Sequence, residues 1–193
     1  MKVNCNLFDI KLHIIGVAGI NLETLVQKAK TGDVQAFREI FESFSSKLFL
    51  YLLSRTSARE DALDLAQEIF IDLWKELGTF EFRSDEAFSG FIFSIAKRKL
   101  YHYYQSKRET IPLDENLPGA SYEMETNDYR YLTKHINMLA EKYQELLKLR
   151  YWSGLTFAEI ASVLNIREGR AKVWHHRAIK KLQTLMEQHG EAI

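Results

Sequence analysis

The sequence is poor in cysteine and proline. Cys5 is the one cysteine among 193 residues, which excludes an intramolecular disulfide and a zinc site built from several thiolates. Pro112 and Pro118 are the two prolines, and this scarcity favours a mostly helical chain because proline interrupts helices. A single thiol suits a reducing compartment, so we predict a cytoplasmic protein.

Long hydrophobic runs are missing as well. The apolar stretch LFLYLL at 48–53 is far shorter than the roughly 20 residues that cross a bilayer, and it fits a buried helix better. Residues 1–20 do not resemble a signal peptide, because Asp9, Lys11 and His13 interrupt their apolar part. We therefore predict no membrane insertion, and we expect 1–20 to form an N-terminal extension before the folded domains.

Signatures of catalysis and cofactor binding are also lacking. None of the six histidines forms a metal-binding spacing such as H-E-x-x-H, and the chain has neither a glycine-rich phosphate loop nor a nucleophile elbow. We predict no catalytic residue, no metal site and no cofactor, so an enzyme is the least favoured class.

The net charge of zero conceals a strong segregation of charge. Residues 57–86 hold nine acids and three bases, and residues 97–108 hold five bases and no acid. Residues 109–128 then hold six acids and no base, whereas residues 166–181 hold six bases and one acid. Two basic segments separated by acidic ones indicate two contacts with nucleic acid and a further, different partner.

The stretch 155–182, LTFAEIASVLNIREGRAKVWHHRAIKKL, predicts a helix-turn-helix. Thr156 and Glu159 have the spacing of a capping box, and Asn165 stands where a left-handed turn residue is needed. The second helix is expected to begin near Glu168, to fit the major groove and to reach bases and phosphates. Its expected DNA contacts are Arg167, Arg170, Lys172, His175, His176, Arg177 and Lys180.

The surface of this second helix allows two interpretations. Its inward positions would be Ala171, Val173, Ala178 and Leu182. The plainer interpretation is a helical hairpin whose cationic face is only solvated. A solvated helix usually mixes charges of both signs, and this one has a single acid, so DNA binding is favoured.

The first half of the chain also has clear helix signals. Asn21 and Asp33 are capping residues on either side of a helix that Gly32 ends. Ser57, with Glu60 three residues later, predicts a second capping box at the start of a third helix. Apolar stripes at helical spacing predict a core made of Phe37, Ile40, Phe41, Phe44, Leu48 and Leu52, and of Ala62, Leu65, Ala66, Ile69, Phe70, Leu73, Trp74 and Leu77.

The opposite face of the third helix is acidic. It is either an ordinary solvated face or a docking surface for a basic partner helix. The residues of this face are Asp61, Asp64, Gln67, Glu68 and Asp72.

A further helix, expected from near Glu86, interleaves cations with aromatic rings. Cations that follow a phosphate backbone beside rings that stack on bases are typical of binding to single-stranded or opened DNA. The alternative is that the tyrosines pack in the core and the lysines complement the helix C-terminus. The cations are Lys97, Arg98, Lys99, Lys107 and Arg108, and the rings are Tyr101, His102, Tyr103 and Tyr104.

These signals predict an all-α fold of two small helical domains. The first spans 21–108 and the second, which contains the helix-turn-helix, spans 129–193. A flexible acidic linker at 109–128, with both prolines and a glycine, joins them.

Taken in order, the motifs resemble one family. GDVQAFREIF, EDALDLAQEIFIDLW and the block ending IAKRK resemble region two of the extracytoplasmic-function (ECF) sigma factors, which are promoter-specificity subunits of bacterial RNA polymerase. LLKLRYWSGLTFAEIASVLNI and the basic helix after it resemble region four. The likeness covers 21–108 and 130–185.

The resemblance implies a role for each surface. The acidic helix would dock on the clamp helices of core RNA polymerase, and the basic second helix of the helix-turn-helix would read the minus-thirty-five element. A membrane-bound anti-sigma factor is a further implied partner. The loop 80–87 and the helix after it would open the minus-ten element and hold a flipped base, with contacts from Arg83, Ser84, Lys97, Arg98, Lys99, Tyr101 and His102.

Departures from the family pattern leave the promoter sequence open. Arg167 stands where the family usually has serine, and Arg170 with Ala171 replaces a common Thr-Val. A rival class is a helix-turn-helix regulator that binds duplex DNA as a dimer without polymerase. It accounts for 129–185 but leaves the acidic helix and the tyrosine-rich basic helix unexplained.

Overall fold

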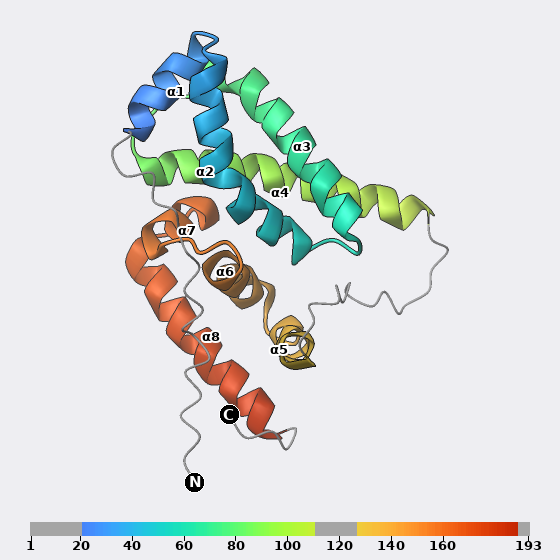
Figure 1. The fold of residues 1–193 in the computed structure, drawn as a ribbon. Helices are drawn as coiled ribbons and strands as arrows, with labels where there is room; N and C mark the ends of the chain where they lie inside the picture. Colours follow the sequence, from blue (N-terminus) through green and yellow to red (C-terminus); the bar gives the residue numbers. More distant parts are fainter. Residues whose placement is uncertain (1–20, 111–126, 189–193) are drawn as a thin grey trace.

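Within each of the two described ranges, the chain folds into helices joined by short connections (Figure 1). The computed structural model describes residues 21–110 and 127–188, and these ranges contain no strand, which confirms the all-α prediction. The elements are α1 (Leu22–Lys30), α2 (Val34–Leu53), α3 (Arg59–Glu76), the short 3-10 helix η1 (Leu77–Thr79), α4 (Asp85–Thr110), α5 (Asn127–Asn137), α6 (Glu141–Tyr151), α7 (Phe157–Leu164) and α8 (Glu168–Gln188).

The first two helices begin at the residues that the sequence predicted. The Asn21 side chain accepts a hydrogen bond from the Glu23 backbone N–H at 2.9 Å. Asp33 accepts from the backbone N–H groups of Gln35 and Ala36 at 2.9 and 3.1 Å. Gly32 lies between them with φ +92°, a conformation that glycine adopts without strain.

The start of α3 differs from the prediction. Ala58 is its N-cap and makes no side-chain cap bond, so the predicted box of Ser57 and Glu60 is wrong. The Ser57 hydroxyl lies 3.0 Å from the Tyr103 hydroxyl of α4. The Ser57 hydroxyl is therefore engaged in a tertiary contact and does not cap the helix. Glu60 and Asp61 still complement the positive end of the helix dipole.

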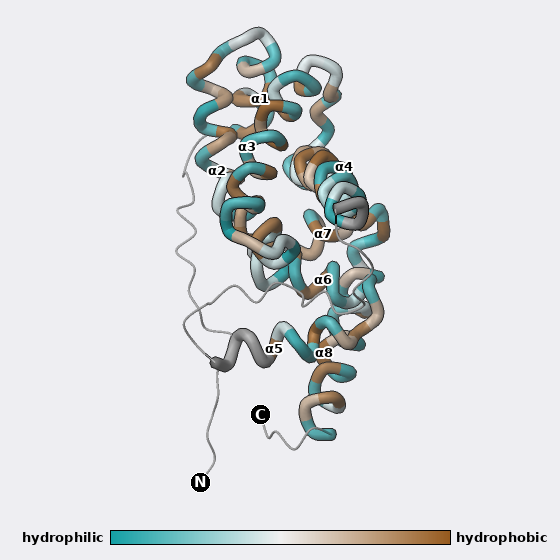
Figure 2. The backbone as a smooth tube through the Cα atoms, turned by 90° about the vertical axis from the view of Figure 1, so that its right-hand side faces the viewer, coloured by the Kyte–Doolittle hydropathy of each residue, from teal (hydrophilic) through white to brown (hydrophobic). Residues whose placement is uncertain are grey.

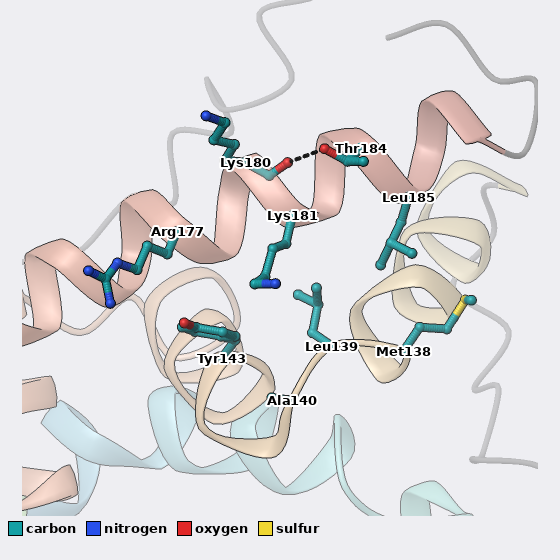
Figure 3. A pocket seen from close by; sticks show the side chains of 9 residues that line it. All are labelled: Met138, Leu139, Ala140, Tyr143, Arg177, Lys180, Lys181, Thr184 and Leu185. Carbon is teal, nitrogen blue, oxygen red and sulfur yellow. Dashed lines mark hydrogen bonds between the residues drawn. The ribbon is translucent and has the colours of Figure 1, made fainter.

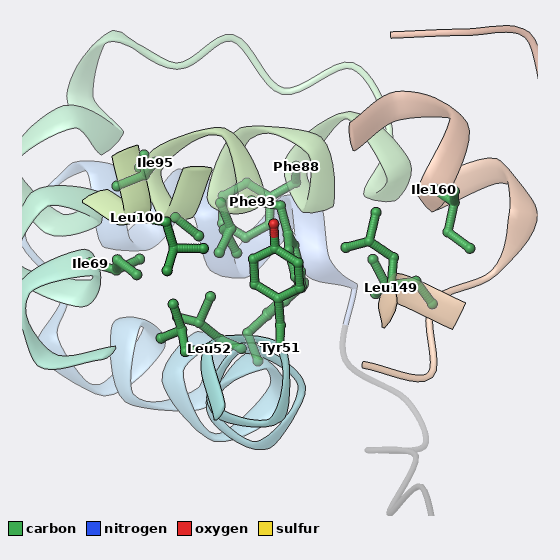
Figure 4. Close-up of a cluster of buried hydrophobic side chains, with 14 of the residues drawn as sticks. Tyr51, Leu52, Ile69, Phe88, Phe93, Ile95, Leu100, Leu149 and Ile160 are labelled. Atoms are coloured by element: carbon green, nitrogen blue, oxygen red, sulfur yellow. The ribbon is translucent and has the colours of Figure 1, made fainter. Parts of the chain in front are cut away.

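Helices α2, α3 and α4 surround the first part of the core (Figure 4). Most residues of the two predicted stripes are buried, but Phe41 is 44% exposed and Trp74 is 38% exposed, so their placement in the core was wrong. Each lies at the rim against another ring, Phe41 at 4.6 Å from Phe70 and Trp74 at 4.8 Å from Phe37. Fully buried residues of this core are Ile40, Leu48, Leu52, Ile69, Leu73, Phe88, Ile92, Phe93 and Ile95.

The second group of helices packs directly against the first. Figures 1 and 2, seen from directions 90° apart, both place α7 directly against α4. The Ser89 hydroxyl on α4 donates to the Glu159 carboxylate on α7 at 3.0 Å. The predicted linker falls mostly in 111–126, outside the described residues, and the domain boundaries stay predictions.

A buried polar cluster joins α2 to α6. Arg55, just after α2, forms an ion pair with Glu145, and the Tyr51 hydroxyl donates to the same carboxylate at 2.8 Å. Burial raises the pKa of Tyr51 to about 12. Burial, together with the nearby charge of Arg55, lowers the pKa of Lys148 to about 8. Lys148 is therefore a cation held in an unfavourable place at neutral pH.

Replacing Lys148 with methionine should stabilise the fold at neutral pH. Below pH 8 both folded and unfolded chains hold the proton, so the folded protein carries the full cost of a buried charge. Between about pH 8 and 10.5 the folded chain has released a proton that the unfolded chain keeps, so wild-type stability rises. We expect K148M to gain about 1–3 kcal/mol at pH 7 and much less at pH 10, measured by urea unfolding.

The exposed Lys134 on α5 provides the control, since K134M should change the free energy of unfolding by less than about 0.5 kcal/mol at either pH. A gain for K148M that is the same at pH 7 and pH 10 would mean that packing, and not the buried charge, causes it.

Candidate nucleic-acid interface

The helix-turn-helix forms as the sequence predicted. The Thr156 hydroxyl accepts from the Glu159 N–H at 3.2 Å, and the Glu159 carboxylate accepts from the Thr156 N–H at 2.7 Å. Asn165 adopts the left-handed conformation, with φ 51° and ψ 50°. The Ile166 N–H donates back to the Ala161 carbonyl at 2.9 Å, which closes the turn. The turn fixes where α8 begins.

Helix α8 buries small residues and exposes its cations. Ala171, Ala178 and Leu182 are buried as predicted. Val173 is 48% exposed, so its predicted inward position was wrong. The exposed cationic side chains are Arg167, Arg170, Lys172, Arg177, Lys180 and Lys181, and His176 is exposed with them.

Val173 is a surface residue that the sequence analysis missed. It follows Arg170 by three residues and precedes Arg177 by four, which places all three on one face of α8. Its spacing from Ala171 could have revealed this, because positions two apart point about 200° away from each other on a helix. An apolar group among cations on such a face can contact a thymine methyl.

Two predicted DNA contacts have partners within the protein. The His175 Nε2 lies 2.8 Å from the Tyr151 hydroxyl, and its ring packs 5.3 Å from Phe157. Burial and nearby positive charge lower the pKa of this half-buried His175, so its ring is neutral at pH 7. Lys172 forms an ion pair with Glu168 at 2.7 Å, one turn earlier on α8.

A groove opens where α5, α6 and α8 meet (Figure 3). It has a volume of about 530 Å³. Its apolar lining includes Leu139, Tyr143 and Leu185, and cations from α8 lie along one side. Arg177 and Lys180, both predicted DNA contacts, are among these cations. The complete lining is Met138, Leu139, Ala140, Tyr143, Arg177, Lys180, Lys181, Thr184 and Leu185.

The basic half of α4 is partly neutralised by α3. The Lys99 ammonium lies 3.1 Å from Glu68 and 2.9 Å from Asp72, and the hydrogen bond from Lys99 lowers the pKa of Asp72. Arg98 pairs with Glu76. These two cations are engaged within the protein, whereas the other predicted residues of this helix, Lys97, Tyr101 and His102, are exposed.

The acidic face of α3 divides into two edges. One edge turns toward α4, where Asp61 accepts from the Tyr103 hydroxyl at 2.8 Å and Asp72 pairs with Lys99. The other edge is exposed to solvent and carries Asp64, Gln67 and Glu68.

Two apolar residues that the sequence analysis did not assign lie on this solvent edge. Leu63 is 43% exposed and Ile71 is 53% exposed, one turn before and one turn after Gln67. Both residues are apolar and lie outside the predicted inward stripe of α3, and this could have identified them from the sequence. A face that mixes acids with exposed aliphatic side chains suits a basic, amphipathic partner.

The loop before α4 forms a pocket large enough for an aromatic ring. The rings of Phe80 and Phe91 stack with their centres 4.5 Å apart. The pocket has a volume of about 410 Å³ and is lined by Thr79, Phe80, Glu81, Arg83, Ala87 and Phe91.

The two predicted DNA contacts of this loop have different positions. Arg83 is 79% exposed at the side chain and lies 3.5 Å from Glu81. Ser84 accepts from the Ala87 N–H at 3.2 Å and thereby caps α4, a structural role that the sequence analysis did not assign.

Neither a metal-binding cluster nor a membrane-spanning helix is present within the described ranges. No group of three or more histidine, cysteine, aspartate or glutamate residues there could hold a metal ion. None of the described helices combines the length and apolar character needed to cross a membrane.

Comparison with known proteins covers both halves of the chain. Residues 40–110 match Sigma-70 region 2, and residues 129–182 match Sigma-70, region 4. The ECF RNA polymerase sigma factor BldN of Streptomyces coelicolor is 28% identical over 171 residues, which cover 84% of this chain and 64% of BldN. The ECF RNA polymerase sigma factor SigF of Caulobacter vibrioides is 27% identical over 177 residues, which cover 86% of this chain and 93% of SigF.

The fold agrees with these matches. The sigma factor RpoE, solved in complex with the anti-sigma factor NepR from Bartonella quintana, superposes with a TM-score of 0.61 at 22% identity, covering 80% of this chain and 98% of RpoE. The helix-turn-helix with its cationic second helix defines a DNA-binding protein. With region 2 and region 4 present in order, the chain belongs to the ECF sigma factors, which are promoter-recognising initiation factors and not enzymes.

The turn at Asn165 allows a direct test of the backbone geometry. A side chain with a Cβ atom is strained in the left-handed region, and asparagine tolerates it better than alanine does. N165A should lower the free energy of unfolding by about 1 kcal/mol, whereas N165G should stay within about 0.5 kcal/mol of wild type, both measured by urea unfolding. Equal losses for the two variants would show that the asparagine side chain, and not the backbone conformation, stabilises the turn.

Proposed function

We propose that this protein binds core RNA polymerase through α3 and directs it to promoters with a minus-ten and a minus-thirty-five element. The observation that carries the proposal is the presence of two chemically opposite surfaces on one chain. The solvent edge of α3 is acidic and aliphatic, whereas the exposed face of α8 is cationic. A protein that only binds DNA has no use for the first surface.

The polymerase-binding surface is centred on Gln67. Asp64 and Glu68 attract a basic partner helix, and the exposed Leu63 and Ile71 supply apolar area to bury against it. Asp61 and Asp72, also predicted for this surface, support it indirectly because their contacts to α4 orient α3.

The minus-ten element would be read by the loop before α4. The pocket beside Phe80 and Phe91 can hold a base flipped from the stack, at a cost of a few kcal/mol that contacts in the pocket offset. Arg83 lines this pocket, and its exposed guanidinium can contact the backbone of the displaced strand. The exposed Lys97, Tyr101 and His102 would continue this contact along α4.

The minus-thirty-five element would be read by the first turns of α8. Arg170 and Val173 are placed for base edges, the arginine for guanine and the valine for a thymine methyl. Arg177 and Lys180 lie further along the helix, where phosphates are within reach.

Regulation by an anti-sigma factor in the cytoplasm completes the proposal. RpoE of Bartonella quintana, which shares this fold, was solved with the anti-sigma factor NepR. The single cysteine suits the reducing environment of that compartment.

Transcription in vitro tests the function directly. Purified protein is added to bacterial core polymerase on a pool of genomic fragments, and transcript starts are sequenced. We expect discrete starts preceded by two shared elements. The triple variant D64A/Q67A/E68A should lose at least about tenfold in co-purification with core enzyme, because it removes two charged groups and the central Gln67 from the docking surface.

A matched variant controls for the loss of charge. Glu23, Gln27 and Glu42 are exposed on α1 and α2, away from the docking surface, and their triple alanine variant should co-purify normally. Absence of any start, together with tight binding of duplex DNA by the protein alone, would instead indicate an ordinary helix-turn-helix regulator.

The two ends of α8 should respond differently to mutation. R170A should change which minus-thirty-five sequences are preferred, with a loss of about 1–3 kcal/mol at one base pair. K180A should weaken binding to all promoter variants alike and reduce the salt slope by about one. Binding of holoenzyme to a panel of minus-thirty-five variants at several salt concentrations measures both. Equal effects of the two substitutions on every variant would refute this division.

A further inference from the structure

The loop that forms the pocket beside Phe80 and Phe91 is held by a lysine from another helix. Lys30, the last residue of α1, donates a hydrogen bond through its ammonium group to the backbone carbonyl of Phe80 at 2.8 Å. A hydrogen bond from a charged donor is stronger than one between neutral groups. Because the acceptor belongs to the main chain, the bond fixes the position of the loop itself.

The helix that carries Lys30 is anchored in the core. Val26 and Ala29 of α1 are buried, and α1 packs against η1, the 3-10 helix that leads into the loop. Lys30 follows Ala29 directly and is half-buried. The ammonium group therefore comes from an element whose own position is set by packing, which suits a side chain that holds something else in place.

Local contacts fix the two ends of the loop. At one end Leu77 is fully buried, and its carbonyl accepts from the Phe80 N–H at 3.1 Å. At the other end the Ser84 carbonyl accepts from the Phe88 N–H at 3.1 Å in the first turn of α4. Each of these bonds joins residues three or four positions apart, whereas the bond from Lys30 crosses 50 positions and ties the loop to a different part of the chain.

Phe80 connects this bond to the pocket. Its ring stacks on Phe91, with the ring centres 4.5 Å apart and an angle of 18° between the planes. The carbonyl that accepts from Lys30 belongs to the peptide group between Phe80 and Glu81, and both of these residues line the pocket. Rotation of that peptide group would displace both lining residues, and a binding site tolerates displacements of only about 0.5 Å.

We propose that Lys30 is a positioning residue for reading of the minus-ten element, since it holds the Phe80 carbonyl so that the pocket is formed before a flipped base enters it. The inference rests on the proposed function. Lys30 lies outside residues 40–110, which match Sigma-70 region 2, so it adds α1 to the parts of the chain that serve this pocket. A preformed pocket binds more tightly because no ordering of the loop opposes binding.

Binding of single strands with and without one base tests the role of Lys30. Holoenzyme is titrated with oligonucleotides that carry the displaced strand of a minus-ten element found in the transcription assay, and each base in turn is replaced by an abasic site. With wild-type protein, removal of the flipped base should weaken binding at least about fivefold, because stacking on that base is lost. In K30M this ratio should fall below about twofold, while the affinity for the abasic strand stays that of wild type.

Two further variants separate the hydrogen bond from the charge. K30R keeps a charged donor at the same position, so its ratio should stay within about twofold of the wild-type ratio. Lys28 is an exposed cation on the same helix, and K28M removes the same charge without touching the loop. The ratio for K28M should equal that of wild type.

The outcomes distinguish this inference from the proposed function. A K30M ratio equal to that of wild type would overturn the positioning role. Equal losses of binding to the intact and the abasic strands would also overturn it, because Lys30 would then contact phosphate or stabilise the fold as a whole. If wild-type holoenzyme has no position at which removal of a base weakens binding, the pocket holds no flipped base and the proposed reading of the minus-ten element fails instead.

Discussion

Helix α4 packs on two sides, and the arrangement of the other helices depends on this. Phe88, Ile92 and Phe93 are fully buried, and the core they join extends to Leu149 and Ile160 of α6 and α7 (Figure 4). The same helix begins beside the ring-lined pocket and exposes cations in its second half. One element therefore links the loop that holds Arg83, a hydrophobic core and the helix-turn-helix.

Ion pairs between α3 and α4 explain how a chain of zero net charge presents separate acidic and cationic surfaces. Lys99 and Arg98 in the basic half of α4 form ion pairs with Asp72 and Glu76 of α3. The acidic outer edge of α3, Lys97 of α4 and the cationic face of α8 stay exposed. Some of the charged segments seen in the sequence thus pair with each other between α3 and α4, and the others form exposed charged surfaces.

Features that depend on a few neighbouring residues could be predicted from the sequence. The caps at Asn21, Asp33 and Thr156 and the left-handed Asn165 are of this kind, and all four are confirmed. Ser57 failed because its hydroxyl contacts Tyr103, which lies 46 residues away on another helix.

Apolar spacing alone does not show how wide a buried face is. Phe41 and Trp74 were therefore assigned to the core although each is at least 38% exposed. The contacts of Lys99 with α3 and of Gly90 with α7 join distant parts of the chain, so no local pattern could reveal them. Charge alone did not distinguish Lys99, which forms ion pairs with α3, from the exposed Lys97. The predicted polymerase and DNA surfaces therefore depended on the order of the motifs along the chain.

The inward side of α8 has a consequence for evolution. It holds the small residues Ala171 and Ala178, and the fold depends on them and on the turn at Asn165. The outward positions carry little of the stability of the domain. Under the proposed function, substitutions at these positions would change promoter preference without endangering folding, so a lineage that duplicates this protein would acquire a new regulon through very few mutations.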